Sequence, residues 1–192
     1  MTKPTHTHAP ETREVTGSGD APPTQRPRLY VACLAAYNSG ILHGRWIDVT
    51  TPDEIRGELT AMLAESPVPG AEEWAIHDQE GFEDISLSEY ADFDTVCDLA
   101  SFLAEHGRLG AKLYDHFGGR LDETRAAFDD YAGPYKTAAE FAEEVIRETG
   151  TQIPQSLEYY IDWQALARDM ALNGEILVFQ TGFDEVHIFW SR

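Results

Sequence analysis

The central part of this chain carries no lysine or arginine over a long distance. From residue 57 to residue 107, fifty-one residues pass without either, while thirteen of them are Asp or Glu. Ten of these acids lie between Glu72 and Asp98. Because ionised carboxylates are almost never buried unpaired, the segment must fold with these charges on its surface. A surface this one-sided should attract a strongly basic partner.

The rest of the composition describes a folded protein. Hydrophobic residues make up 42% of the 192 residues, which is enough to supply packed cores. Residues 1–27 hold three acids and three bases, so the remaining 165 residues, with thirty-one acids and eleven bases, carry the whole net charge of −20. Cys33 and Cys97 lack a C-x-x-C spacing, so we expect neither a disulfide nor a zinc site. We expect both cysteines to be buried thiols in a reducing compartment. No apolar run has membrane-spanning length and the N-terminus has no signal sequence, so we expect a cytoplasmic protein and no membrane partner.

The first half of the chain predicts a tail followed by a small α/β module. Residues 1–27 are rich in Pro, Thr and Gly and are expected to be a disordered tail. Residues 28–37 and 41–49 read as two strands that pair around a turn at 38–40. Thr51, followed by Pro52 and Glu54, predicts the start of a helix that ends before residue 66. A third strand is expected at 73–79, and the module spans residues 28–83.

The second half predicts a helical module and a second α/β module. Apolar residues from Tyr90 to Leu103 recur with helical period, and Gly107 predicts the end of that helix. Two short helices, at about 109–117 and 121–131, complete a module over residues 84–132. The last module, 133–192, is expected to contain a helix led by Thr137, a helix at about 162–172 and a terminal β-hairpin. The predicted fold class is α+β, an elongated chain of three small modules (α/β, helical, α/β).

Sequence motifs for chemistry are missing. An EF-hand loop counted from Asp92 would place Cys97 and Leu103 where glycine and glutamate are required. The chain has no H-E-x-x-H, no G-x-S-x-G and no P-loop. It also lacks the mixture of basic and aromatic residues of a nucleic-acid binder. We therefore expect no enzyme activity, no catalytic residue, no metal, no cofactor and no direct binding of nucleic acid.

Three segments resemble a known family. Residues 30–48 (YVACLAAYNSGILHGRWID), 91–107 (ADFDTVCDLASFLAEHG) and 129–144 (DDYAGPYKTAAEFAEE) are similar to the ArdA antirestriction proteins, and the resemblance extends over residues 28–192. It implies an elongated, dimeric mimic of bent B-form DNA, usually encoded on a mobile genetic element. Such a protein occupies the DNA-binding groove of type I restriction–modification enzymes, and it inhibits restriction and in many cases modification.

The resemblance assigns antirestriction to the acidic helical region, hence to Asp92, Asp94 and Asp98 and then to Glu89 and Glu105. Because a helix stripe spaces charges by ~6 Å and a duplex by ~1.7 Å, several elements must contribute charges together. The remaining residues of the predicted partner-binding surface are Glu72, Glu73, Asp78, Glu80, Glu83, Asp84, Asp115, Asp122, Glu123, Asp129, Asp130, Glu140, Glu143, Glu144 and Glu148. The expected partner is the methyltransferase core of a type I enzyme, and dimerisation is expected in the C-terminal module, near Trp163 and residues 183–190.

Two other interpretations stay open at this point. An acidic structural or adaptor protein, adapted to high salt, would use the same charge for solubility alone. A carboxylate-dependent hydrolase would require a deep pocket with perturbed carboxylates, and no sequence feature favours it.

Overall fold

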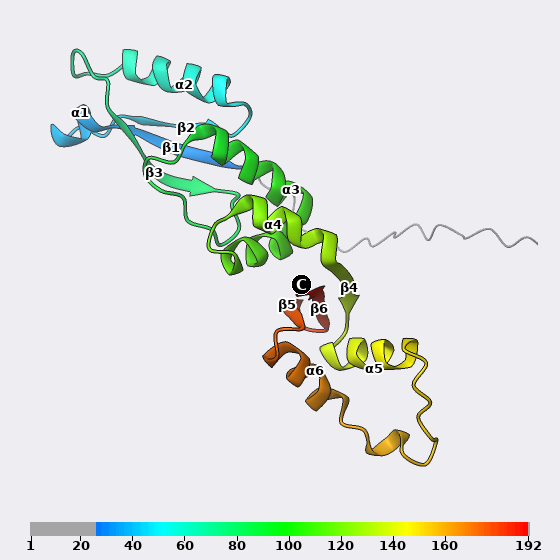
Figure 1. Cartoon of the computed structure of the whole chain (residues 1–192). Helices are drawn as coiled ribbons and strands as arrows, with labels where there is room; N and C mark the ends of the chain where they lie inside the picture. The colour runs from blue at the N-terminus through cyan, green and yellow to red at the C-terminus, as the bar shows by residue number, and fades with distance from the viewer. Residues whose placement is uncertain (1–25, 192) are drawn as a thin grey trace, which may run out of the picture.

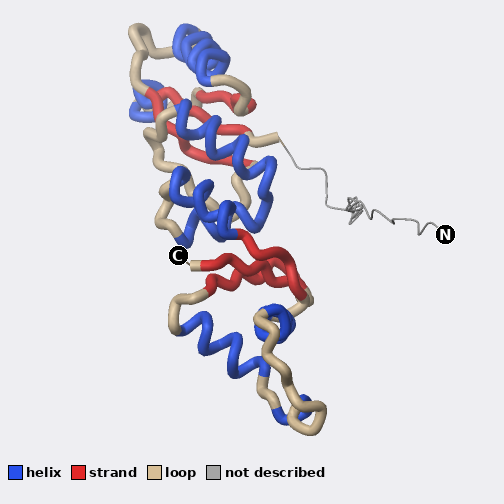
Figure 2. The backbone as a smooth tube through the Cα atoms, turned by 45° about the vertical axis from the view of Figure 1, so that its right-hand side comes forward, coloured by secondary structure: helices blue, strands red, loops and turns tan. Residues whose placement is uncertain are grey.

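The computed structural model describes residues 26–191, which form an elongated body of helices and two small antiparallel sheets (Figures 1 and 2). The predicted α+β class is confirmed. The tail expected over residues 1–27 lies outside the described residues except for its last two.

The first sheet contains β1 (Arg28–Cys33), β2 (Gly44–Asp48) and β3 (Trp74–Glu80) in the order β2-β1-β3. The predicted pairing of the first two strands is confirmed, with Leu29 opposite Ile47. The predicted first strand was wrong from residue 34 onward, where the chain forms the short helix α1 (Leu34–Asn38). Its sequence, LAAYN, contains two alanines and a leucine, which favour helix. The turn that follows brings the Ile41 amide within 3.0 Å of the Ala36 carbonyl oxygen.

One helix covers this sheet as the capping signal predicts. In α2 (Pro52–Ala64), the Thr51 hydroxyl accepts a hydrogen bond from the Glu54 amide. Ile55, Leu59 and Met62 are buried and belong to the same core as the sheet.

The acidic helical segment packs on that same core. The helix α3 (Phe93–His116) buries Phe93, Val96 and Leu99 in the cluster that contains the first sheet. Gly107, with φ 51° and ψ −139°, kinks α3 where the sequence predicts an end, and the second half of α3 is the predicted helix at 109–117. α4 (Leu121–Ala127) and the 3-10 turn η1 (Phe128–Asp130) follow. The described residues form two hydrophobic clusters, whereas the sequence predicts three modules divided at residues 83 and 132. That division stays a prediction.

The second cluster contains the C-terminal sheet and two helices. The elements are β4 (Tyr131–Tyr135), α5 (Ala138–Glu148), η2 (Glu158–Tyr160), α6 (Trp163–Leu172), β5 (Ile176–Gly182) and β6 (Glu185–Trp190), with strand order β4-β6-β5. The predicted hairpin is confirmed in the pairing of β5 with β6. The predicted capping at Thr137 is confirmed by the Glu140 amide, which donates to the Thr137 hydroxyl.

The strand β4 was not predicted, and the expected helix at 121–131 was wrong at Tyr131, which begins this strand. Gly133 and Pro134 disfavour a strand in the sequence, since proline cannot donate to the ladder. β4 tolerates both because it is an edge strand whose register shifts between Tyr131 and Gly133. Gly133 has φ 131°, which a residue with a side chain rarely adopts.

An aromatic seam joins the two cores; it consists of Phe102, His106, Phe128, Tyr131 and Phe189. The Phe128 ring stacks on His106 with centroids 4.0 Å apart and meets Phe189 edge-on at 5.4 Å. Phe189 in turn packs against Tyr131 at 4.8 Å. We call residues 26–130, which contain the first core, the first body, and residues 131–191, which contain the second core, the second body. The ring contacts between the two bodies fix how one is oriented on the other.

A histidine of β6 extends the seam. The His187 ring stacks on Tyr131, and its Nδ1 lies 2.6 Å from the Tyr131 hydroxyl. Burial lowers the pKa of His187, although the Glu185 carboxylate opposes the shift. Burial also raises the pKa of the Tyr131 phenol.

Candidate partner-binding surface

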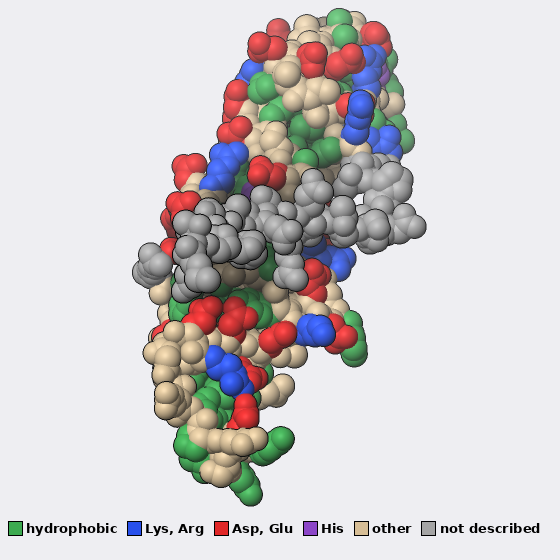
Figure 3. Space-filling view, turned by 90° about the vertical axis from the view of Figure 1, so that its right-hand side faces the viewer, with side chains coloured by type: hydrophobic (Ala, Val, Ile, Leu, Met, Phe, Trp, Pro, Cys, Tyr) green, Lys and Arg blue, Asp and Glu red, His purple; other side chains and the backbone are tan. Residues whose placement is uncertain are grey.

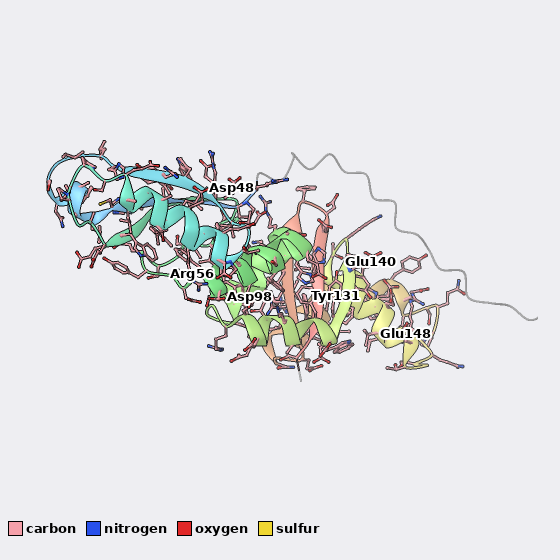
Figure 4. The ribbon with its side chains drawn as sticks, turned by 90° about the horizontal axis from the view of Figure 1, so that it is seen from above. Asp48, Arg56, Asp98, Tyr131, Glu140 and Glu148 are labelled. Carbon is pink, nitrogen blue, oxygen red and sulfur yellow. The ribbon has the colours of Figure 1, made fainter. Side chains whose placement is uncertain are left out.

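The predicted acidic residues lie on both bodies and almost all of them are exposed. Only Glu80, Asp130 and Glu143 of the twenty are half-buried. Glu72 to Glu80 precede or lie on β3, Glu83 to Asp92 lie in the loop after it, and the others lie on α3, α4, η1 and α5. In Figure 3, carboxylates lie along much of the face in view, with Lys and Arg between them, whereas the lower end of that face shows hydrophobic and other side chains. Figure 4 shows Asp98 on the first body and Glu140 and Glu148 on α5 of the second.

The residues assigned to the acidic helical region differ in what they contact. Asp92 caps α3, since its carboxylate accepts a 3.1 Å hydrogen bond from the Thr95 amide. Asp94 forms a 2.5 Å ion pair with Arg56 of α2. Asp98 is exposed one turn further along α3 and has no ion pair among the described residues. Of these three carboxylates, Asp98 is therefore the one whose charge is available to a partner without breaking a contact.

Arg56 is a residue that the sequence analysis missed. It contacts Asp53 at 3.3 Å on its own helix and Asp94 on α3. An arginine that touches acids from two helices holds those helices together and lowers the local charge. This contact could not be predicted from local sequence, because Arg56 and Asp94 are 38 positions apart.

Other predicted residues are also paired. Glu80 binds Arg28, Glu123 binds Arg120, and Glu143 binds Arg147. The hydrogen bond from Arg120 lowers the pKa of Glu123. These contacts are exposed or half-exposed and contribute little to stability.

The phenol of Tyr135 donates a 3.1 Å hydrogen bond to Glu144 on α5. Burial, and then this bond to a carboxylate, raise the pKa of Tyr135 to about 12. The Glu140 carboxylate accepts from the Lys136 amide at 3.0 Å, so two acids of α5 also fix β4 against its helix.

The acidic surface is interrupted near the kink of α3. A hollow of about 590 Å³ is lined by Glu83, Asp84 and Asp115 and also by Arg108 and Lys112. The two cations are exposed and lie one helical turn apart, and they end the stretch without positive charge. Acids outnumber cations in the lining, so the hollow does not favour an anionic ligand.

Within residues 26–191 there is no group of three or more His, Cys, Asp or Glu that could hold a metal ion. No helix in the described part of the chain is long and apolar enough to cross a membrane.

The family model for antirestriction protein (ArdA) matches residues 29–185, which is most of the chain. The chain belongs to the ArdA family. The resemblance inferred from three segments is thereby confirmed. No curated protein matches the chain.

Membership places this ArdA protein among the antirestriction proteins, which act against restriction–modification systems. The match includes all twenty acids of the predicted partner-binding surface. Which of these acids bind a partner stays a prediction.

Sequence reasoning also missed an apolar cluster on the second body. Leu157, Tyr159 and Tyr160 are 53%, 91% and 84% exposed, and they lie on or next to η2. Large apolar side chains that gather on a monomer surface are typical of protein contacts. No pattern in the sequence distinguishes these tyrosines from buried ones, because their exposure depends on the loop that carries η2.

Proposed function

We propose that this ArdA protein is a DNA mimic, which occupies the DNA-binding groove of the methyltransferase core of a type I restriction–modification enzyme. The observation that carries the proposal is the run of exposed carboxylates over both bodies of an elongated molecule (Figure 3). The Lys and Arg side chains of a DNA-binding groove would exchange phosphates for these carboxylates.

The charges match a duplex only if several elements act together. Acids one helical turn apart on α3 are ~6 Å apart along the axis, whereas a duplex presents a charge every ~1.7 Å. Acids from β3, the loop after it, α3, α4 and α5 supply the further rows. The aromatic seam supports the proposal because it holds these rows in one orientation.

Competition with DNA tests the proposal. Labelled duplex bound to a type I methyltransferase core should be displaced by the protein, and displacement should weaken steeply between low and high salt. An acidic protein adapted to salt would displace no DNA and would require salt in order to fold. Either of those results would refute the proposal.

The contribution of single acids should be small. An exposed ion pair is worth up to ~1 kcal/mol, and a mimic spreads its binding over many of them. Asp94→Asn alone should therefore leave competition nearly intact, since Asp94 is already paired with Arg56. Replacing Asp78, Asp84, Asp98, Asp115 and Asp122 together by Asn should abolish competition. Complete loss from the Asp94 change alone would contradict a distributed mechanism.

We further propose that the protein is a homodimer, that it acts in the cytoplasm, and that a mobile genetic element encodes it. The exposed cluster around Tyr159 and Tyr160 would pair with a second copy, because a dimer joined there doubles the length of the acidic path. Of the two places where the sequence predicts the dimer interface, Trp163 begins α6, the helix that follows η2, whereas Phe183 lies on the turn between β5 and β6. Sedimentation of Tyr159→Ser combined with Tyr160→Ser should give a monomer. A variant that stays dimeric would place the interface elsewhere.

A further inference from the structure

An apolar tip stands at the end of the first body, formed by Tyr37, Ile41 and Leu42. These side chains are 54%, 42% and 88% exposed, and they fall within six residues. α1 and the turn after it form an outer end of the molecule in Figure 1, remote from α5 and α6. Three large apolar side chains this close on an acidic surface cannot be explained by solubility.

The exposure of the tip is fixed by the backbone around it. The Ile41 amide donates to the Ala36 carbonyl at 3.0 Å, and Gly40 takes φ 75° in the turn between them. On the other side of Leu42, the His43 ring lies 2.7 Å from the Met62 carbonyl oxygen. Leu42 thus lies between two hydrogen-bonded residues and is itself exposed.

Carboxylates lie beside the tip on the side of Tyr37. Tyr37 lines a hollow of about 460 Å³ together with Asp78 and Glu89, and no Lys or Arg lines it. The Glu89 carbonyl accepts from Ile76 of β3 at 2.8 Å, and the Glu73 carbonyl accepts from Leu34 of α1 at 3.0 Å. These bonds hold acidic residues of the partner-binding surface next to the apolar tip.

We infer that the tip binds a basic protein surface at the edge of the partner's DNA-binding groove, with Leu42 as an apolar anchor. This inference rests on the proposed function. The carboxylates of Asp78 and Glu89 beside Tyr37 favour a surface rich in Lys and Arg. An apolar residue surrounded by polar contacts is typical of the centre of a protein interface. A phosphate backbone offers no such contact to Leu42. The tip gives the inhibitor an affinity for the enzyme that DNA lacks, and that part of the affinity does not weaken with salt.

Salt dependence separates this contact from the charges. Leu42→Gln should weaken displacement of DNA from the methyltransferase core about tenfold, as expected for the loss of much of one buried leucine. The factor should be the same at low and high salt. The deficit of Asp78→Asn, by contrast, should become smaller as salt is raised, because salt screens the pair that it removes.

Leu172→Gln is the matched control, since it makes the same substitution at a leucine that is 77% exposed at the C-terminal end of α6, on the other body. It should compete as the unaltered protein does, and both variants should keep the unfolding midpoint. The inference is wrong if Leu42→Gln competes normally, if its deficit vanishes at high salt, or if it changes the sedimentation of the free protein, which would assign the tip to a second copy. Failure of the unaltered protein to displace DNA would instead refute the proposed function.

Discussion

Phe128→Ala should uncouple the two bodies of this protein. Phe128 is half-buried and contacts Phe102 and His106 of α3 and Tyr131 and Phe189 of the C-terminal sheet. Truncating a fully buried phenylalanine costs ~3–5 kcal/mol, so we expect about 2–3 kcal/mol for this half-buried ring.

Urea denaturation measures the loss directly. At a slope of ~1–3 kcal/mol per molar, the midpoint should fall by roughly 1 M. Because the seam links two cores, the variant should also unfold in two separate transitions. Small-angle scattering of the folded variant should show a broader distribution of overall lengths, and competition with DNA should weaken although every carboxylate is retained.

Phe183→Ala provides the control, because the same truncation at a 94% exposed ring should change the free energy of unfolding by less than ~0.5 kcal/mol. If Phe128→Ala loses no more stability than this control, or if its scattering is unchanged, the seam does not hold the bodies together. If the variant becomes flexible and still competes fully, rigidity is not needed for mimicry.

Three further predictions concern local structure. Gly107→Ala should destabilise the protein by ~1–3 kcal/mol through backbone strain alone, since nothing lies within 4 Å of an added Cβ. Gly57→Ala, in the middle of α2, should instead stabilise the protein by ~0.5–1 kcal/mol. Urea titrations in which both substitutions change the free energy of unfolding in the same direction would contradict this reasoning. Asp92→Ala should cost ~1 kcal/mol of unfolding free energy, while Asp92→Asn keeps the cap to the Thr95 amide and should cost only a few tenths, so equal losses would show that charge matters more than the cap. The pKa of His187 is lowered on folding, so its contribution to stability is present above the ordinary value of about 6.5 and is lost as pH falls below it; stability should therefore decrease as pH is lowered through 6.5, and His187→Phe should reduce that decrease in urea titrations on the two sides of this pH.

Features that depend on neighbouring residues could be predicted from the sequence. The caps at Thr51 and Thr137 use a side chain and an amide three positions apart, so both are visible in the chain itself. The β5–β6 hairpin likewise follows from two apolar runs that flank Gly182.

Features that depend on distant residues could not be predicted. β4 exists because Tyr131 pairs with Phe189, 58 positions away, and that pairing overrides the local preference of Gly133 and Pro134. Most acids of the predicted partner-binding surface are exposed, but the ion pair of Asp94 with Arg56 could not be predicted, because it too joins distant residues. Composition indicates how much charge the surface carries, whereas the tertiary fold decides which charges remain unpaired.

The aromatic seam has a consequence for how such proteins diversify. Phe128, Tyr131 and Phe189 of the seam carry no acidic or basic group, and the acids of the proposed partner-binding surface are other residues. Substitutions among Phe128, Tyr131 and Phe189 could therefore alter curvature while leaving the electrostatic pattern untouched. Under the proposed function, related proteins whose partner enzymes bend DNA to different degrees would need substitutions at only a few of these ring positions, and the rest of the molecule could stay the same.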